Sequence, residues 1–331
     1  MKYCYLNLQP VTVDGYSQAA CKALNGGRRK NFPYILSFTR ADLMLPANMS
    51  KGRYQSISGV QDKVLLDWKD GQLAVVEKGG TFILKPRPSN PYLRFSQDVP
   101  ANEHLTMQIA SQLFGIKVAV NACIRFANGE LAYITRRFDR RDELPILQED
   151  LCQLMGRTEE IHGFDYKYDA SYEEIVPTVK KICPAYQVEL RKMFFQILFN
   201  YVFANGDAHL KNFSFYQSAS GDYILSPAYD LLNTAIHSPN ELGRTALDLF
   251  KDDYMTDEYQ QLGYYTEPDF IRLGGFYGVG EASVRRMIVQ FHRCKAKVEE
   301  MIGRSFLSDE AKKLYIEIFH DRLHALRQSR I

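Results

Sequence analysis

The spacing of the apolar residues changes near residue 138 of this 331-residue chain. Between about Ser56 and Arg137 the apolar runs are short and are separated by Asp-Gly and Gly-Gly turns, which is typical of antiparallel strands. Beyond Asp139 the apolar residues recur at intervals of three and four, which is typical of amphipathic helices. We therefore expect an α+β chain of two lobes with a cleft between them. Residues 1–138 would form the strand-rich lobe and residues 139–331 the helical lobe.

The strand-rich part contains four apolar runs and one stretch with helical spacing. The runs are Val64-Leu65-Leu66, Leu73-Ala74-Val75-Val76, Phe82-Ile83-Leu84 and Leu131-Ala132-Tyr133-Ile134-Thr135. In the helical stretch, Asn102 is a favourable N-cap, Leu105 and Ile109 share one face, and Gly115 can end the helix.

The C-terminal part is predicted to contain three long helices. The first carries Leu190, Ile197 and Tyr201 on one face, and the others are expected at 280–301 and 308–327. Residues 236–270 are rich in Pro, Gly and acidic residues, and we expect a surface excursion there.

Composition limits the partners and the compartment. The chain is 46% hydrophobic and carries 41 Lys and Arg against 39 Asp and Glu, so no charge excess demands nucleic acid or a membrane. The six cysteines are scattered and include no C-x-x-C pair, which is typical of reduced thiols in the cytoplasm. No segment reaches the ~18 uninterrupted apolar residues that span a bilayer. We expect a cytoplasmic protein that binds no nucleic acid directly and no membrane.

The segment Asn205–Ser214 places an acid and an amide five residues apart, at Asp207 and Asn212. A protein-kinase catalytic loop presents its proton-accepting Asp and its metal-binding Asn at this spacing. A second acid, Asp230, follows downstream and could be a further magnesium ligand. Alternatively, Asp207 is a turn residue after Asn205-Gly206 and Asn212 is a structural cap.

Two features of the strand-rich lobe suit a nucleotide. The small-residue loop Ser56–Lys63 precedes a strand, and small side chains let backbone N–H groups approach phosphates closely, although a plain polar turn would look the same. Lys85 ends a strand and could pair with the α- and β-phosphates, or it could be a solvated strand-end lysine. Glu103 could form an ion pair with Lys85 or could be an acid favoured near a helix N-terminus.

The order of these features indicates phosphoryl transfer. Asp207 would accept the proton of a substrate hydroxyl, and Asn212 and Asp230 would hold Mg²⁺. His209 and Lys211 lie in the same turn, where either phosphate contact or packing would explain them.

The succession of motifs between residues 56 and 232 resembles the HipA family of toxin serine/threonine kinases. The motifs are Ser-Ile-Ser-Gly-Val-Gln-Asp-Lys, Phe-Ile-Leu-Lys-Pro, Asn-Glu-His-Leu, Arg-Arg-Phe-Asp-Arg, Gln-Glu-Asp-Leu-Cys-Gln, Asn-Gly-Asp-Ala-His-Leu-Lys-Asn-Phe-Ser and Pro-Ala-Tyr-Asp-Leu. The resemblance implies a two-lobed protein-kinase-like fold, ATP and Mg²⁺ as cofactors, and a HipB-like DNA-binding antitoxin as partner.

The same resemblance implies roles for individual residues. Asp207 would be the base and Asn212 and Asp230 the metal ligands. The nucleotide would be bound by Ser58, Gly59, Val60, Gln61, Asp62, Lys63, Lys85, Arg136, Arg137, Phe138, His209, Lys211 and Tyr229.

Relatives in this family phosphorylate a serine of the phosphate loop and thereby silence themselves, and Ser56 and Ser58 match those positions. A phosphate there would add almost two negative charges beside those of the nucleotide. Only 55 residues precede the loop, so the chain looks closest to the short HipT-like branch, in which a separate HipS-like protein supplies the N-terminal subdomain.

The function expected from the resemblance is an ATP-dependent protein serine/threonine kinase, the toxin of a toxin–antitoxin system, with an aminoacyl-tRNA synthetase as target. The alternatives are a small-molecule phosphotransferase of the aminoglycoside type and a degenerate kinase that serves as a scaffold. The scaffold is disfavoured by the joint retention of Lys85, Asp207, Asn212 and Asp230.

Overall fold

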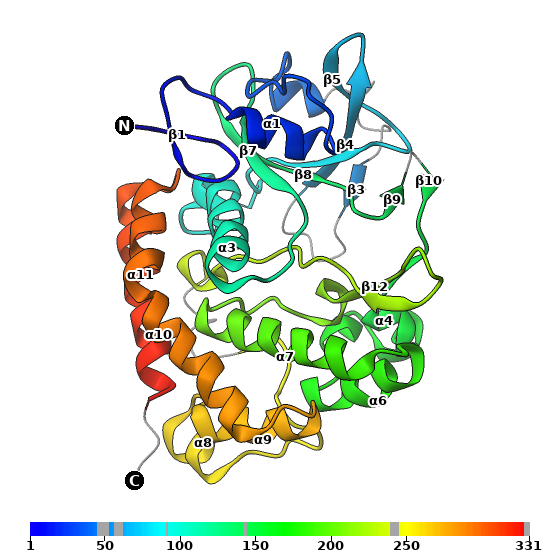
Figure 1. The fold of residues 1–331 in the computed structure, drawn as a ribbon, viewed down its shortest axis with the longest axis vertical. Helices are drawn as coiled ribbons and strands as arrows, with labels where there is room; N and C mark the ends of the chain where they lie inside the picture. Colours follow the sequence, from blue (N-terminus) through cyan, green and yellow to red (C-terminus); the bar gives the residue numbers. More distant parts are fainter. Residues whose placement is uncertain (45–52, 56–61, 91, 142–143, 239–244, 328–331) are drawn as a thin grey trace.

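The computed structural model describes residues 1–44, 53–55, 62–90, 92–141, 144–238 and 245–327 of the chain. A curved sheet fills one lobe and helices fill the other, as Figure 1 shows. This arrangement confirms the two-lobed α+β fold expected from the sequence. No helix among these residues has both the length and the apolar character needed to cross a bilayer.

The sheet of the first lobe is antiparallel throughout. A turn at Asp70-Gly71 connects two of its strands, and both residues have positive φ, at 48° and 82°, as a tight two-residue hairpin requires. The strands are paired in the order β3 (Arg53–Gln55), β4 (Asp62–Lys69), β6 (Phe82–Lys85), β8 (Leu131–Arg136) and β7 (Asn121–Arg125), with β5 (Gln72–Val75) on β4.

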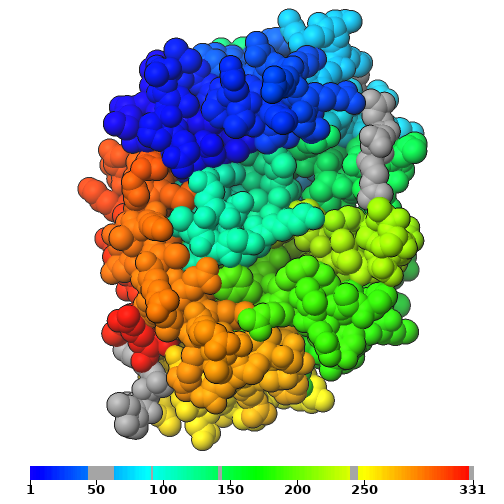
Figure 2. Space-filling model, viewed as in Figure 1, coloured from blue at the N-terminus to red at the C-terminus, as the bar shows by residue number. Residues whose placement is uncertain are grey.

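The residues before the sheet cover one of its faces, drawn in blue in Figures 1 and 2. Leu24, Phe32 and Leu36 are buried against Leu66 and Phe82 of the sheet, so this segment closes a small core of its own. Its elements are β1 (Lys2–Tyr3), β2 (Pro10–Val11), α1 (Gln18–Leu24) and the 3-10 turn η1 (Ala41–Met44).

Helix α3 (Val99–Phe114) follows the 3-10 turn η2 (Ser96–Asp98) and packs against the other side of the sheet. It ends at Gly115, which has a φ of 67°, as predicted. The prediction that Asn102 caps this helix is wrong, because the helix begins earlier, with Pro100 in its first turn. The Asn102 amide instead donates to Asn233 O at 2.8 Å and accepts from Asn233 N at 3.0 Å, so it bonds a distant loop.

The helical lobe and α3 share one hydrophobic core. Phe114 of α3 stacks on Phe291 at a ring-centroid distance of 4.5 Å, and Phe203 stacks on Phe319 at 5.1 Å. The helices α10 and α11 run along one side of the molecule up to α3 (Figure 1). The helices of this lobe are α5 (Glu159–His162), α6 (Tyr172–Ile182), α7 (Tyr186–Val202), α8 (Asp257–Leu262), α9 (Glu267–Phe276), α10 (Glu281–Arg304) and α11 (Asp309–Ala325).

The segment 236–270 is not the plain surface excursion expected. Leu247, Leu249 and Phe250 are buried in the core of the helical lobe, and the segment carries α8 and the start of α9. The segment was expected to lie at the surface because its Pro, Gly and acidic residues outnumber this short apolar stretch in the sequence.

Short strands and 3-10 turns connect the lobes and carry the loop after α7. Asp150 begins α4 (Leu151–Leu154) with a capping box to Gln153, so a helix cap explains this acid. The other elements are β9 (Arg140–Arg141), β10 (Leu144–Pro145), β11 (Gln148–Asp150), β12 (Ser214–Gln217), β13 (Tyr223–Leu225), η3 (Tyr166–Tyr168), η4 (Leu210–Asn212) and η5 (Thr234–Ile236).

Candidate active site

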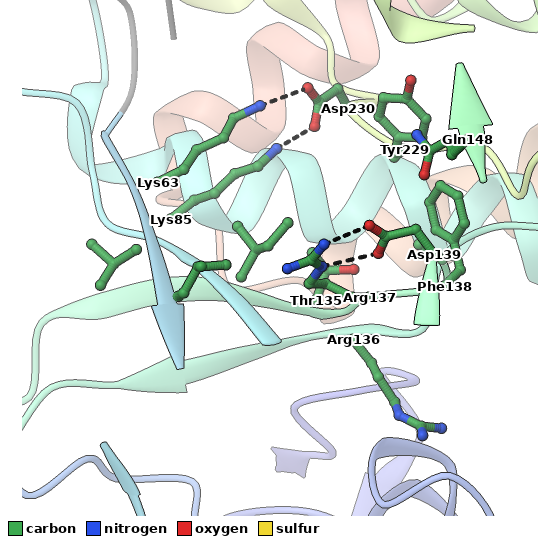
Figure 3. Close-up of a pocket in the computed structure, with 14 residues that line it drawn as sticks. Lys63, Lys85, Thr135, Arg136, Arg137, Phe138, Asp139, Gln148, Tyr229 and Asp230 are labelled. Carbon is green, nitrogen blue, oxygen red and sulfur yellow. Dashed lines mark hydrogen bonds and ion pairs between the residues drawn. The ribbon is translucent and has the colours of Figure 1, made fainter. Parts of the chain in front are cut away.

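A cluster of charges lies between β6 and α3. Lys85, the last residue of β6, places its Nζ 2.6 Å from Oε1 of Glu103 and also contacts the carboxylate of Asp230. Lys63 Nζ lies 3.2 Å from the other carboxylate oxygen of Asp230, as Figure 3 shows. The side chains of Lys85 and Glu103 are only 5% and 2% exposed. Two lysines from the sheet thus hold an acid of the helical lobe.

The charges of this cluster fix its protonation. Burial alone would raise the pKa of Asp230, but Lys63 and Lys85 outweigh it and hold that pKa well below its usual value. Burial would lower the pKa of Lys85, and the two neighbouring carboxylates raise it instead. Burial raises the pKa of Glu103, although Lys85 opposes this. Asp230 is therefore ionised and Lys85 protonated at neutral pH.

The backbone at Asp230 is held in an uncommon conformation. Its φ is 55°, in the left-handed region that residues other than glycine rarely adopt. Asn205 Nδ2 donates to the carbonyl oxygen of Asp230 at 3.2 Å and to Asn200 Oδ1 at 3.1 Å. Such strain costs on the order of 1 kcal/mol and is concentrated at functional sites.

The loop after α7 brings Asn212 to the same acid. Asn212 Nδ2 lies 3.4 Å from Asp230 Oδ2, and its buried Oδ1 has no hydrogen-bond partner among the described residues. A free amide oxygen beside an ionised carboxylate is a donor set that suits Mg²⁺, which usually takes one or two carboxylates and completes its shell with phosphate and water. The two residues therefore fit the metal that the fold implies.

Asp207 lies in the loop between α7 and η4 and is more open than Asp230. Its side chain is 39% exposed and accepts a hydrogen bond from the Tyr168 hydroxyl. His209 Nε2 lies 3.8 Å from Asp207 Oδ1. Burial lowers the pKa of His209 to about 4, although Asp207 opposes this shift, so the imidazole is neutral at pH 7.

A cavity of about 360 Å³ opens beside Lys85 and Asp230 and ends at the lobe junction (Figure 3). Its volume lies within the range of small-molecule sites. At the junction the rings of Phe138 and Tyr229 lie 5.8 Å apart, and the Tyr229 hydroxyl donates to Lys211 O at 2.7 Å. The lining residues are Lys63, Val64, Leu65, Ile83, Lys85, Ala119, Thr135, Arg136, Arg137, Phe138, Asp139, Gln148, Tyr229 and Asp230.

Several residues that were expected to bind the nucleotide point away from the cavity, bond a neighbouring side chain or do not line the cavity. Figure 3 shows the Arg136 side chain pointing away from the cavity, and a β-carbon at Gly26 would lie 2.3 Å from its Nη1. Arg137 is turned toward Asp139, with Nε to Oδ1 at 2.9 Å. Lys211 donates to the Tyr166 hydroxyl at 3.0 Å, and neither it nor His209 lines the cavity.

Part of the predicted phosphate loop, namely Ser56, Ser58, Gly59, Val60 and Gln61, lies outside the described residues. Asp62 is the first residue of β4. Sequence reasoning did not find Tyr168, which precedes Asp207 by 39 residues and belongs to none of the recognised motifs.

A family model for the HipA-like C-terminal domain matches residues 55–298. The chain belongs to the HipA family. A Haemophilus influenzae protein with the name "Putative kinase" is 28% identical over 350 residues, which cover 98% of each chain. The HipA serine/threonine-protein kinase toxin of Shewanella oneidensis is 29% identical over 204 residues. That match covers 56% of this chain and 45% of the toxin, so this HipA-family chain spans less than half of that relative.

Two solved structures share the fold. A chain of the Shewanella oneidensis complex of HipA, HipB and operator DNA superposes with a TM-score of 0.58 and 22% identity, over 82% of this chain and 63% of that chain. The Helicobacter pylori proinflammatory kinase CtkA superposes with a TM-score of 0.52 and 14% identity, over 80% and 90% of the two chains. These matches show that the HipA-family chain has the two-lobed fold of kinases.

Proposed function

We propose that this HipA-family chain is an ATP-dependent protein serine/threonine kinase. The observation that carries the proposal is the meeting of Lys85 from the sheet with Asp230 and Asn212 from the helical lobe. Asn212 Oδ1, which has no hydrogen-bond partner in the described part of the chain, lies in this group, and the cavity opens beside Lys85 and Asp230. This is the arrangement that phosphoryl transfer requires, because the lobes must hold phosphates and metal at one place. Mg²⁺, held by Asn212 and Asp230, would neutralise the charge that develops on the transferred group.

The residues of the chain would divide the remaining work. Lys85 would bind the α- and β-phosphates, since it is a buried cation that lines the cavity. Phe138 and Tyr229 would contact the base at the lobe junction. Asp207 would accept the proton of the acceptor hydroxyl, because its carboxylate is partly exposed and already accepts a hydrogen bond from a hydroxyl group.

Regulation by self-phosphorylation forms part of the proposal. Ser56 and Ser58 would be the acceptors, and Ser58–Lys63 would cover the phosphates. Lys63 supports this role because its ammonium group reaches Asp230, so the chain that follows the loop enters the site. A phosphate on either serine would add negative charge next to the nucleotide.

We further propose that the chain is a toxin of the HipT-like type that phosphorylates an aminoacyl-tRNA synthetase. A HipB-like antitoxin and a separate HipS-like protein would restrain it. The named HipA toxin relative and the solved HipA and HipB complex support a HipB-like partner.

The kinase proposal is tested by incubating the chain with Mg²⁺ and ATP and mapping phosphate by mass spectrometry. We expect phosphate on Ser56 or Ser58 in the wild type and at least about 100-fold less in Asp207→Asn, because the general base is lost. Asp222→Asn, a change at an exposed acid on a surface turn, is the matched control and should behave as wild type.

The outcomes distinguish the alternatives. Nucleotide binding without transfer to protein would favour the scaffold, and transfer to an added aminoglycoside would favour the small-molecule phosphotransferase. Growth arrest on expression of the wild type but not of Asp207→Asn would support the toxin, and equal growth would contradict it.

A further inference from the structure

The hydroxyl group of Tyr168 donates a hydrogen bond to Oδ1 of Asp207. In phosphoryl transfer the acceptor hydroxyl must make this same contact with the base before it loses its proton. A hydroxyl of the protein itself therefore lies at the position that the acceptor needs.

The Tyr168 ring is held at this position by its neighbours. It meets the His209 ring edge-on at a centroid distance of 5.1 Å, and Lys167 Nζ lies 4.8 Å from its centroid. His209 is neutral, so it does not compete as a cation for Asp207. The hydroxyl is thus directed at the base by the packing of the ring.

The segment that carries Tyr168 is anchored on both sides. On the preceding side, the Tyr166 hydroxyl accepts from Lys211 of the catalytic loop at 3.0 Å. On the following side, Asp169 accepts from Arg157 at 3.0 Å, and Ser171 begins α6 with a capping box. Gly163, with a φ of 76°, lies at the start of the segment, in a conformation that favours glycine.

A kinase must favour its acceptor over water, which is abundant and also small enough to reach the base. The Asp207 side chain is 39% exposed, so burial alone does not exclude water from it. A hydroxyl that is tethered beside the carboxylate competes with water, because its effective concentration is high and its orientation is fixed.

We propose that Tyr168 is a positioning residue of the acceptor site that keeps water from Asp207. An acceptor hydroxyl that is held by further contacts with the protein displaces Tyr168, whereas water does not. Tyr168 thereby makes the site selective for macromolecular acceptors. This inference rests on the proposed kinase function.

The test compares full-length wild type with Tyr168→Phe, which keeps the ring and removes only the hydroxyl. Two quantities are measured in one sample with Mg²⁺ and ATP: phosphate released to water, and phosphate incorporated into the protein or into added dephosphorylated casein. We expect hydrolysis to rise about tenfold in Tyr168→Phe, because a hydrogen bond to a charged group is lost from the position that water then occupies. Tyr223→Phe is the matched control, since its hydroxyl donates to the Glu149 carboxylate at 2.7 Å, away from Asp207.

A second readout does not depend on turnover. Labelling of Asp207 by a water-soluble carbodiimide with glycinamide, followed by peptide mass spectrometry, should be faster in Tyr168→Phe than in wild type. The rate in Tyr223→Phe should equal that of wild type.

Unchanged or slower hydrolysis in Tyr168→Phe, with incorporation intact, would overturn the inference and leave the proposed function standing. Phosphate on Tyr168 itself would also overturn it, because the tyrosine would then be an acceptor. If no variant turns over ATP in either channel, the proposed function fails and the inference fails with it, even when the labelling rates differ.

Discussion

Asp230 and Asp207 are held in opposite ways. Asp230 is half-buried, with 22% of its side chain exposed, and its charge is balanced by two lysines. Asp207 is 39% exposed and contacts uncharged groups, the hydroxyl of Tyr168 and a neutral His209, with the charge of Lys167 nearby. At Asp230, on the side that would bind the nucleotide, folding brings opposite charges into direct contact. At Asp207, on the side that would bind the acceptor, the carboxylate is held by single hydrogen bonds that a substrate can replace.

The contrast between Asp230 and Asp207 predicts that substitution of Lys85 has the largest effect on stability. Lys85→Met would leave Glu103 buried without its counter-charge and would lose one of the two cations at Asp230, so the free energy of unfolding should fall by about 3–5 kcal/mol. Urea unfolding measures this, and nucleotide binding should be lost as well. Lys69→Met, at an exposed strand end, should change stability by less than about 0.5 kcal/mol.

The double variant Lys85→Met with Glu103→Leu separates stability from function. It removes the buried carboxylate together with its partner, so stability should recover in part while nucleotide binding stays lost. A single Lys85→Met variant as stable as Lys69→Met would contradict the contrast between the two sides.

A fall in pH below 6.5 should lower the free energy of unfolding through His209, which lies beside Asp207. Burial lowers the pKa of His209 from 6.5 to about 4, so between these values the unfolded chain binds a proton that the folded chain does not. Stability is then fully present above pH 6.5 and falls as the pH drops toward 4, by up to about 3 kcal/mol for this residue. Asp230 adds little slope in most of this window, because Lys63 and Lys85 hold its pKa below the usual 3.8 despite its burial, so its stabilising contribution is lost mainly below about pH 4.

Urea unfolding at several pH values between 7.5 and 4.5 checks this prediction. His209→Gln should show a shallower loss of stability with falling pH than wild type. Some loss should remain, because burial also lowers the pKa of His104 to about 4. Equal slopes in the two proteins would show that His209 is protonated in the folded state.

The smallest effect on stability is expected at Ser171, which follows the segment that carries Tyr168. The Ser171 hydroxyl accepts from Glu174 N at 3.3 Å at the start of α6, and Ser171→Ala should lower stability by about 1 kcal/mol. Hydrogen exchange of residues 165–169 should become faster, while that of β6 should not change. Faster exchange in β6 as well would mean that the two sides do not respond separately.

Local patterns predicted the frame of the site well. The turn at Asp70-Gly71 and the helix end at Gly115 follow from backbone preferences of single residues. The apolar runs fixed the sheet, and the helical spacing fixed α7, α10 and α11. These features depend on neighbours in the sequence, so one sequence was enough.

The parts that sequence reasoning missed depend on contacts across the fold. Asn102 looked like a helix cap, but its amide bonds Asn233, which is 131 residues away. The contact of Tyr168 with Asp207 spans 39 residues, and that of Lys63 with Asp230 spans 167. Nothing near these residues in the sequence shows such a pairing, because it is produced by packing of the lobes.

Helix α3 has a consequence for how the chain could be divided. It follows the first strands in the sequence, yet its apolar side belongs to the core that α7, α10 and α11 also form. A fragment that ends at residue 138 would expose that surface to water and should aggregate or require its complement. Cutting the gene after residue 138 would therefore yield two pieces that fold only when expressed together, and such a pair could serve as a split-protein reporter of assembly.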